Sequence, residues 1–151
     1  MEETAALQEQ LNLYYQIWCE ATQLYEKWSR KRGITYNTVL ALCTLHNNQE
    51  HCTQKMICDQ WGLPKQTVNT ILKDFENKGY VTFDFLPSDR RNKLILLTDS
   101  GKKYASEISS SLNCLDFYAT QKMGLDRMKH LNDNLALYLK YFREAEQDGS
   151  I

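Results

Sequence analysis

The hydrophobic repeat of this chain changes once, near its middle, and this change limits the possible folds more than any other feature. Between Gln54 and Lys78, apolar residues recur every three or four positions, as they do on one face of a helix. In Tyr80–Phe85 apolar residues alternate with polar ones, and Lys93–Leu97 is a short apolar run. The sequence therefore predicts helix followed directly by a β-hairpin, with the polar residues 87–92 at the hairpin tip.

Threonine, glycine and proline mark the ends of two helices in this segment. Thr53 has the short hydroxyl side chain of an N-cap, so we expect a helix over Gln54–Trp61 that ends at Gly62. A second helix is expected over Pro64–Lys78, because the missing N–H of proline does no harm in a first turn. The side chains expected in the core are Met56, Ile57 and Trp61 from the first helix, and Val68, Ile71, Leu72 and Phe75 from the second.

Longer helices are predicted on both sides of this segment, and only 6 Gly and 2 Pro interrupt the chain. The expected helices are Leu7–Arg30, Thr35–Leu45, Asp99–Tyr118 and a last one from Gly124 to Phe142, after which Glu144–Ile151 should fray. The aromatic stripe of the first helix either belongs to the core alone or also contacts another subunit. The expected fold is mainly α with a small β-hairpin (α+β), in one domain over residues 1–151.

The charges are distributed unevenly along the chain. Residues 1–52 carry a net charge of −2, residues 53–103 of +3 and residues 104–151 of −2, although the whole chain is close to neutral at −1. A basic middle between acidic flanks is expected where the middle touches phosphates. The acidic N-terminus is unlike a secretory signal and no run of about 18 apolar residues occurs, so we expect a cytoplasmic protein with no membrane partner.

Two short helices joined by a glycine turn form a helix-turn-helix, whose second helix can lie in the major groove of DNA. Its exposed face offers amides that can pair with base edges, hydroxyls that can meet phosphate or a thymine methyl, and ammonium groups for phosphates. The candidate DNA-contacting residues of this helix are Lys65, Gln66, Thr67, Asn69, Thr70 and Lys73. Taken alone, such a face can equally be an ordinary solvated surface.

The hairpin that follows favours the DNA interpretation. Its tip carries Asp89, Arg90 and Arg91, and a narrow projection of this kind can bring a guanidinium group into the minor groove. The alternative is a charged hairpin that serves only solubility.

Four short motifs carry a resemblance to a known family. They are GLPKQTVN at residues 62–69, KGYV at 78–81, DRR at 89–91 and LTDSGKKYA at 97–105. As a set they resemble the MarR family of bacterial transcription regulators, and the likeness extends over nearly the whole chain. It implies a winged helix-turn-helix lobe over about residues 35–98, with dimerisation helices over about 1–32 and 99–146.

The resemblance also implies a function and several residue roles. A homodimer would bind double-stranded DNA at a pseudo-palindromic operator, with recognition helices about 34 Å apart, and would repress transcription without enzyme activity. Arg91 would enter the minor groove, Asp89 would pair with a neighbouring basic residue, and Arg90 and Lys93 would reach phosphates. Together with Ser88, these residues complete the expected DNA contacts. Pro64 departs from the serine found here in many relatives and removes a cap hydroxyl.

Other interpretations concern regulation rather than the fold. A small aromatic or anionic effector could bind beside Tyr14, Tyr15, Trp18 and Tyr25, although these rings can equally be core or interface aromatics. Cys19 could sense peroxide, but we expect a buried, inert thiol there. His46, His51, Cys52 and Cys58 are crowded enough to raise the question of a metal sensor, but their spacing fits no standard site.

Two other functions, an enzyme and a protein-binding module, are less favoured by the sequence. The sequence shows no nucleophile with its base, no paired carboxylates and no phosphate-binding glycine loop, so we expect no enzyme activity, cofactor or metal. A winged-helix module that binds protein instead of DNA stays open because the net charge is low, and Arg90-Arg91 argues against it.

Overall fold

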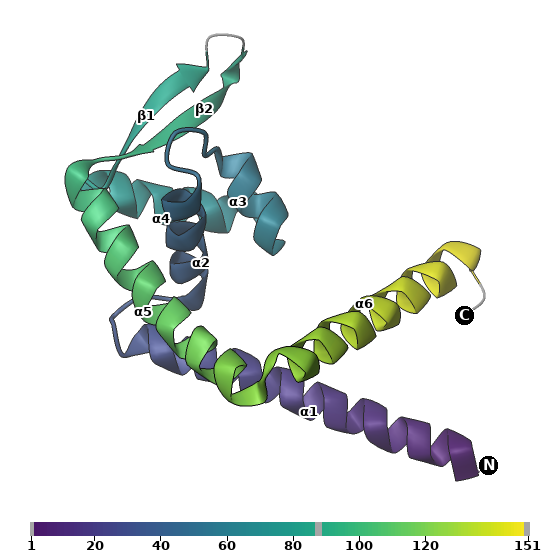
Figure 1. The fold of residues 1–151 in the computed structure, drawn as a ribbon. Helices are drawn as coiled ribbons and strands as arrows, with labels where there is room; N and C mark the ends of the chain where they lie inside the picture. The colour runs from purple at the N-terminus through teal and green to yellow at the C-terminus, as the bar shows by residue number, and fades with distance from the viewer. Residues whose placement is uncertain (1, 87–88, 150–151) are drawn as a thin grey trace. The chain divides into compact units, whose positions relative to one another are not determined.

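The computed structural model describes the backbone of residues 2–86 and 89–149, and the side chains of residues 3–85, 93–147 and 149. The chain forms two compact units, residues 1–109 and 110–151, which are described separately. The first unit contains α1 (Glu2–Arg30), α2 (Tyr36–Asn47), α3 (Gln54–Trp61), α4 (Lys65–Asn77), β1 (Val81–Leu86), β2 (Asp89–Leu97) and the start of α5 (Asp99–Met123) (Figure 1). The second contains the rest of α5 and α6 (Leu125–Asp148). The predicted fold class, helices with a small hairpin, is confirmed.

The core of the first unit forms around α2. This helix is buried along most of its length, and α3, α4 and the hairpin contribute apolar side chains to the same core. The four residues predicted as the buried stripe of α4, Val68, Ile71, Leu72 and Phe75, are all buried. In α3 only Ile57 is buried, whereas Met56 is 36% and Trp61 39% exposed, so the expectation for these two side chains is wrong. The indole Nε1 of Trp61 donates to the hydroxyl of the buried Thr44 at 2.7 Å, while the rest of the side chain stays partly exposed.

The predicted caps Thr35, Thr53 and Gly62 are confirmed, whereas α4 begins at Lys65 and ends at Asn77, so Pro64 is its N-cap and not part of its first turn. The hydroxyl of Thr35 accepts from the Thr38 amide at 3.2 Å, and that of Thr53 accepts from the Met56 amide at 3.3 Å. Gly62 ends α3 with φ +63°, a left-handed conformation that residues with a Cβ rarely adopt. These caps fix where α3 begins and where the chain turns into α4.

The hairpin is longer than the sequence indicates. Its strands are antiparallel, with Val81 opposite Leu97 and Phe85 opposite Lys93, but β2 begins at Asp89 and not at Lys93. The polar residues 89–92, expected in the tip, are part of the strand: Asp89 pairs with Leu86 after a shift in register at Phe85/Leu86, and backbone pairing tolerates polar side chains. The tip itself lies outside the described residues.

Three helices also extend beyond their predicted ends. The first begins at Glu2 instead of Leu7, the fifth reaches Met123 instead of Tyr118, and the last continues to Asp148, where fraying was expected. These extensions are rich in good helix formers and contain no Gly or Pro, so helix continues although the apolar pattern has stopped. No helix in the described part of the chain combines the length and the apolar character needed to cross a membrane.

The hairpin is anchored to α5 where the two meet. The Thr98 hydroxyl donates to the Gly79 carbonyl at 2.6 Å and accepts from the Gly101 amide at 3.1 Å. A Cβ at Gly101 would lie 1.9 Å from the Tyr80 carbonyl oxygen, far inside van der Waals contact. Glycine is therefore required here for the close approach of α5 to the root of the hairpin.

We expect Gly101→Ala to lower the free energy of unfolding by about 1–3 kcal/mol or more, because the clash is with backbone and forces α5 to move. Urea unfolding followed by circular dichroism, at one fixed protein concentration, measures the change. Ser110→Ala, at an exposed position of the same helix, is the control and should leave stability nearly unchanged. An unchanged midpoint for Gly101→Ala would contradict the close approach.

Candidate nucleic-acid interface

The exposed face of α4 carries the side chains that the sequence singled out. Lys65, Gln66, Thr70 and Lys73 are exposed, and Thr67 and Asn69 are half-buried. Pro64 occupies the N-cap and makes no side-chain cap bond. Because the opposite stripe is buried, the helix presents its amides, hydroxyls and ammonium groups to the outside, with most of them in its first two turns.

A hollow of about 530 Å³ lies beside this face, between α3, α4 and the hairpin. Its lining includes four lysines, Lys55, Lys65, Lys73 and Lys93, against one carboxylate, Glu76. Leu72, Phe83 and Ile95 supply apolar lining. The excess of ammonium groups makes this hollow a place where a phosphate backbone, or another polyanion, is attracted.

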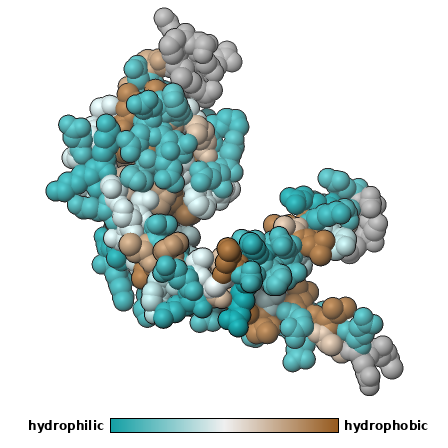
Figure 2. Space-filling view, viewed as in Figure 1, coloured by the Kyte–Doolittle hydropathy of each residue, from teal (hydrophilic) through white to brown (hydrophobic). Residues whose placement is uncertain are grey.

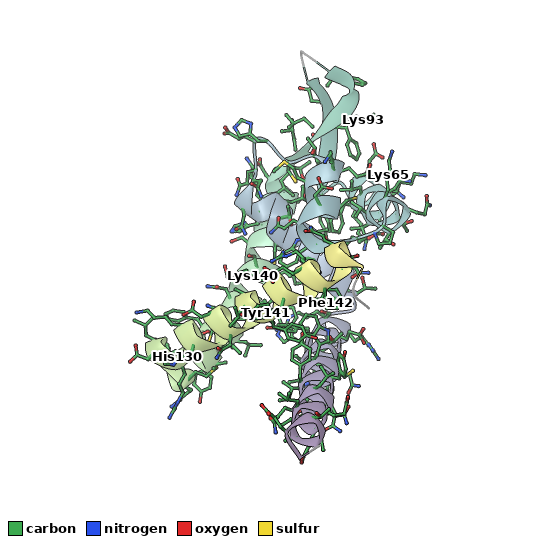
Figure 3. All side chains as sticks on the ribbon, turned by 90° about the vertical axis from the view of Figure 1, so that its right-hand side faces the viewer. Lys65, Lys93, His130, Lys140, Tyr141 and Phe142 are labelled. Carbon is green, nitrogen blue, oxygen red and sulfur yellow. The ribbon has the colours of Figure 1, made fainter. Side chains whose placement is uncertain are left out.

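The lysines of this hollow come from separate elements of the first unit. Figure 3 shows Lys65 on α4 and Lys93 on β2. The Lys93 ammonium lies 5.7 Å from the centre of the Phe83 ring, which favours a cation at this place. Lys55 is ion-paired with Asp59 one turn along α3, and the carboxylate raises the pKa of this lysine.

Two α3 residues at this hollow, Gln54 and Lys55, were not among the predicted contacts. Both precede the helix that carries the base-reading pattern, and polar residues on a short helix carry no special signal in the sequence. Their place became visible only from the packing of α3 against α4.

The predicted contacts at the hairpin tip are only partly described. The backbone of Asp89, Arg90 and Arg91 runs in β2, but their side chains, and all of Ser88, lie outside the described residues. Their roles stay predictions. Lys93 is the hairpin contact whose side chain is described, and it is exposed.

The four aromatic residues predicted beside an effector fall into two groups along α1. The rings of Tyr14 and Trp18 are 6.1 Å apart, and those of Tyr14 and Tyr15 are 5.6 Å apart. About two turns beyond Trp18, Tyr25 stacks on Tyr36 of α2 at 5.1 Å, which ties α1 to the helix at the centre of the core. Tyr25 therefore has a structural contact, and the effector pocket stays a prediction.

Apolar side chains are exposed on α1, on the second half of α5 and on α6. Brown surface along α1 and α6 is visible in Figure 2. Trp18 is 58%, Tyr118 61% and Phe142 61% exposed in the single chain. The other large apolar residues of these three helices that are more than 50% exposed are Leu7, Tyr15, Ile17, Leu24, Leu115, Phe117, Leu125 and Tyr141. So many large apolar residues on long helices are unusual for a monomer.

The cysteines differ in exposure. Cys19 is exposed in the single chain, so the expectation of a buried thiol there is wrong for the single chain. Cys52 is buried, and burial raises the pKa of its thiol to about 11.

In the part of the chain that the structure describes, no three His, Cys, Asp or Glu side chains are grouped to hold a metal, so His46, His51, Cys52 and Cys58 form no such centre.

Comparisons with known proteins match both the central segment and the fold. Residues 32–92 match the model of the MarR family. A MarR family regulator from Neisseria meningitidis is 27% identical, with a TM-score of 0.76 over 93% of this chain and 96% of that one. AbfR of Staphylococcus epidermidis, overoxidized and bound to DNA, is 29% identical, with a TM-score of 0.62 over 93% and 98% of the two chains.

A third solved structure shares the fold. MepR of S. aureus in complex with DNA is 23% identical, with a TM-score of 0.69 over 87% of this chain and 96% of that one. No curated protein sequence matches the chain.

The raised pKa of Cys52 predicts that this thiol is inert. At pH 8 its thiolate fraction should be about a hundredfold lower than that of a thiol with the ordinary value of 9.0. Alkylation with iodoacetamide at pH 8, followed by mass spectrometry of peptides, should leave Cys52 unmodified in the native protein and label it after unfolding in urea. Rapid labelling of native Cys52 would show that the thiol is accessible and reactive.

Proposed function

We propose that this protein binds duplex DNA sequence-specifically as a homodimer and regulates transcription, because residues 32–92 match the model of the MarR family and the chain has the fold of a MarR family regulator. The observation that carries the proposal is the arrangement of α4. Its apolar stripe is buried, its amides and lysines face outward, and a lysine-lined hollow separates it from the hairpin.

The chemistry of this face suits a reader of DNA. Gln66 and Asn69 lie in the first two turns of α4, where a recognition helix meets base edges, and each amide can both donate to and accept from an adenine. Lys65, Lys73 and Lys93 supply charge for phosphates on either side. DNA-bound relatives with the same fold support this assignment.

The dimer follows from the apolar residues of α1, α5 and α6. Leaving them in water would expose large apolar patches, and a second copy supplies matching surface through a two-fold axis. A two-fold dimer presents two copies of α4, so the operator is proposed to be pseudo-palindromic, and the effect on transcription to be repression. We further propose that binding of a small molecule releases the protein from its operator. No contact in the structure identifies the residues that would bind this molecule.

Selection from a pool of random duplexes, at two salt concentrations, tests DNA binding. We expect the protein to retain a pseudo-palindromic sequence, and Asn69→Ala to bind it about 5- to 150-fold more weakly, the range for one lost base contact. Asn77→Ala, at the exposed end of the same helix, is the control and should bind as the unaltered protein does. A folded protein that retains no duplex at either salt concentration would refute the proposal.

Sedimentation velocity tests the dimer. We expect the unaltered chain to sediment as a dimer, and Phe142→Asp to raise the dimer dissociation constant at least about tenfold, because a carboxylate would be buried without a partner. Asn132→Asp adds the same charge at another exposed position of α6 and controls for charge alone. Equal effects of the two substitutions, or a monomeric unaltered chain, would contradict the proposed interface.

A further inference from the structure

The side chain of Gln54 joins the first residues of α3 and α4. Its Nε2 donates to the carbonyl oxygen of Lys65 at 3.0 Å. Lys65 is the first residue of α4, and Pro64 before it offers no side-chain cap. A carbonyl oxygen has two lone pairs, so it can accept this bond in addition to the bond within the helix. Gln54 therefore holds the start of α4 from outside, at an end that lacks a side-chain cap.

The residues just before Gln54 are bonded to the hairpin. The Ile95 amide donates to the Cys52 carbonyl at 2.8 Å, and Thr53 forms an isolated antiparallel bridge with Leu94. Thr53 also caps α3 through its hydroxyl. Three consecutive residues, 52–54, thus join three elements. Residues 52 and 53 are bonded to β2, and Gln54 at the start of α3 is bonded to the start of α4.

We propose that Gln54 is a positioning residue, which fixes the start of α4 relative to the hairpin and thereby determines how well the protein distinguishes its operator from other DNA. The proposal rests on the proposed DNA-binding function. Amides that pair with bases must be held within about 0.5 Å of their bonding geometry. Lysine side chains that meet phosphates are long and flexible, and they tolerate a displaced helix.

This role differs from a direct contact with DNA. The donor group of Gln54 already bonds to Lys65, and its side chain is half-buried. A residue that contacted a phosphate would contribute equally to every sequence. Loss of a positioning bond instead weakens operator binding and leaves non-specific binding, which depends on charge, unchanged.

Gln54→Met is the test variant, because methionine keeps the length of the side chain and its helix propensity but cannot donate to the carbonyl. Gln60→Met is the matched control. Gln60 lies on the same helix, and its Oε1 lies 3.2 Å from the Thr44 hydroxyl of α2, which shares its one hydrogen between this oxygen and the Leu40 carbonyl at 3.0 Å, so the substitution removes a polar contact that does not involve α4.

Binding is measured by fluorescence anisotropy to two labelled duplexes, the operator recovered by selection and a shuffled sequence of equal length. We expect Gln54→Met to weaken operator binding about two- to tenfold, the range for the net contribution of one hydrogen bond, because restoring the position of α4 can cost no more than this. Binding to the shuffled duplex should change less than about twofold, with the same salt dependence. Gln60→Met should leave the ratio of the two affinities unchanged.

Hydrogen exchange in the absence of DNA tests the bond independently. In Gln54→Met the amides of the second turn of α4, from Val68 onward, should exchange faster because they are the first with acceptors in the helix, while those in the middle of α2 keep their protection. The positioning role would be overturned if Gln54→Met left the ratio of the two affinities unchanged, whether or not binding weakened. It would also be overturned if hydrogen exchange in the second turn of α4 did not change. If the unaltered protein does not distinguish the two duplexes, the proposed function itself fails, and the positioning role fails with it.

Discussion

The burial of one stripe of α4 is the constraint on which the candidate interface depends. Val68, Ile71, Leu72 and Phe75 occupy the core, and their removal from water fixes the rotation of the helix about its axis. Once that rotation is fixed, the spacing of 3.6 residues per turn decides that Gln66, Thr70 and Lys73 face outward. The chemistry of the outer face is therefore held in place by apolar contacts on the inner face, without requiring a hydrogen bond from any base-reading side chain.

Elements governed by local chemistry could be predicted from the sequence. Thr53 caps α3 and Gly62 ends it, because a hydroxyl acceptor and a positive φ act within a few residues. Features that depend on distant partners could not be predicted. The hydrogen bond of Trp61 depends on Thr44, seventeen residues away, and the contact between Gly101 and Tyr80 depends on how α5 meets the hairpin. The longer β2 was missed because its first four residues are polar, and the backbone pairing of Asp89 with Leu86 leaves no apolar pattern in the sequence.

In the candidate site too, some residues could be found from the sequence and others only from the packing of distant elements. Its α4 residues were found from the sequence because a buried stripe on a helix defines the opposite face. The contributions of Gln54 and Lys55 were missed because they arise from packing between α3 and α4, which leaves no repeat in the sequence. In the aromatic group of α1, the sequence could not separate Tyr25, which stacks on α2, from the exposed Tyr15 and Trp18.

The near-neutral total charge is compatible with DNA binding, because salt screens distant charges and only those close to the DNA affect it. At physiological salt a charge acts over about 8 Å, so phosphates at α4 are affected by the lysines around the hollow and little by distant carboxylates. There Lys65, Lys73 and Lys93 outnumber the single Glu76, and Asp59 neutralises only Lys55. This local excess of charge attracts DNA of any sequence. Discrimination must then come from base contacts, from the geometry that holds them, and from the use of two copies of α4 at once.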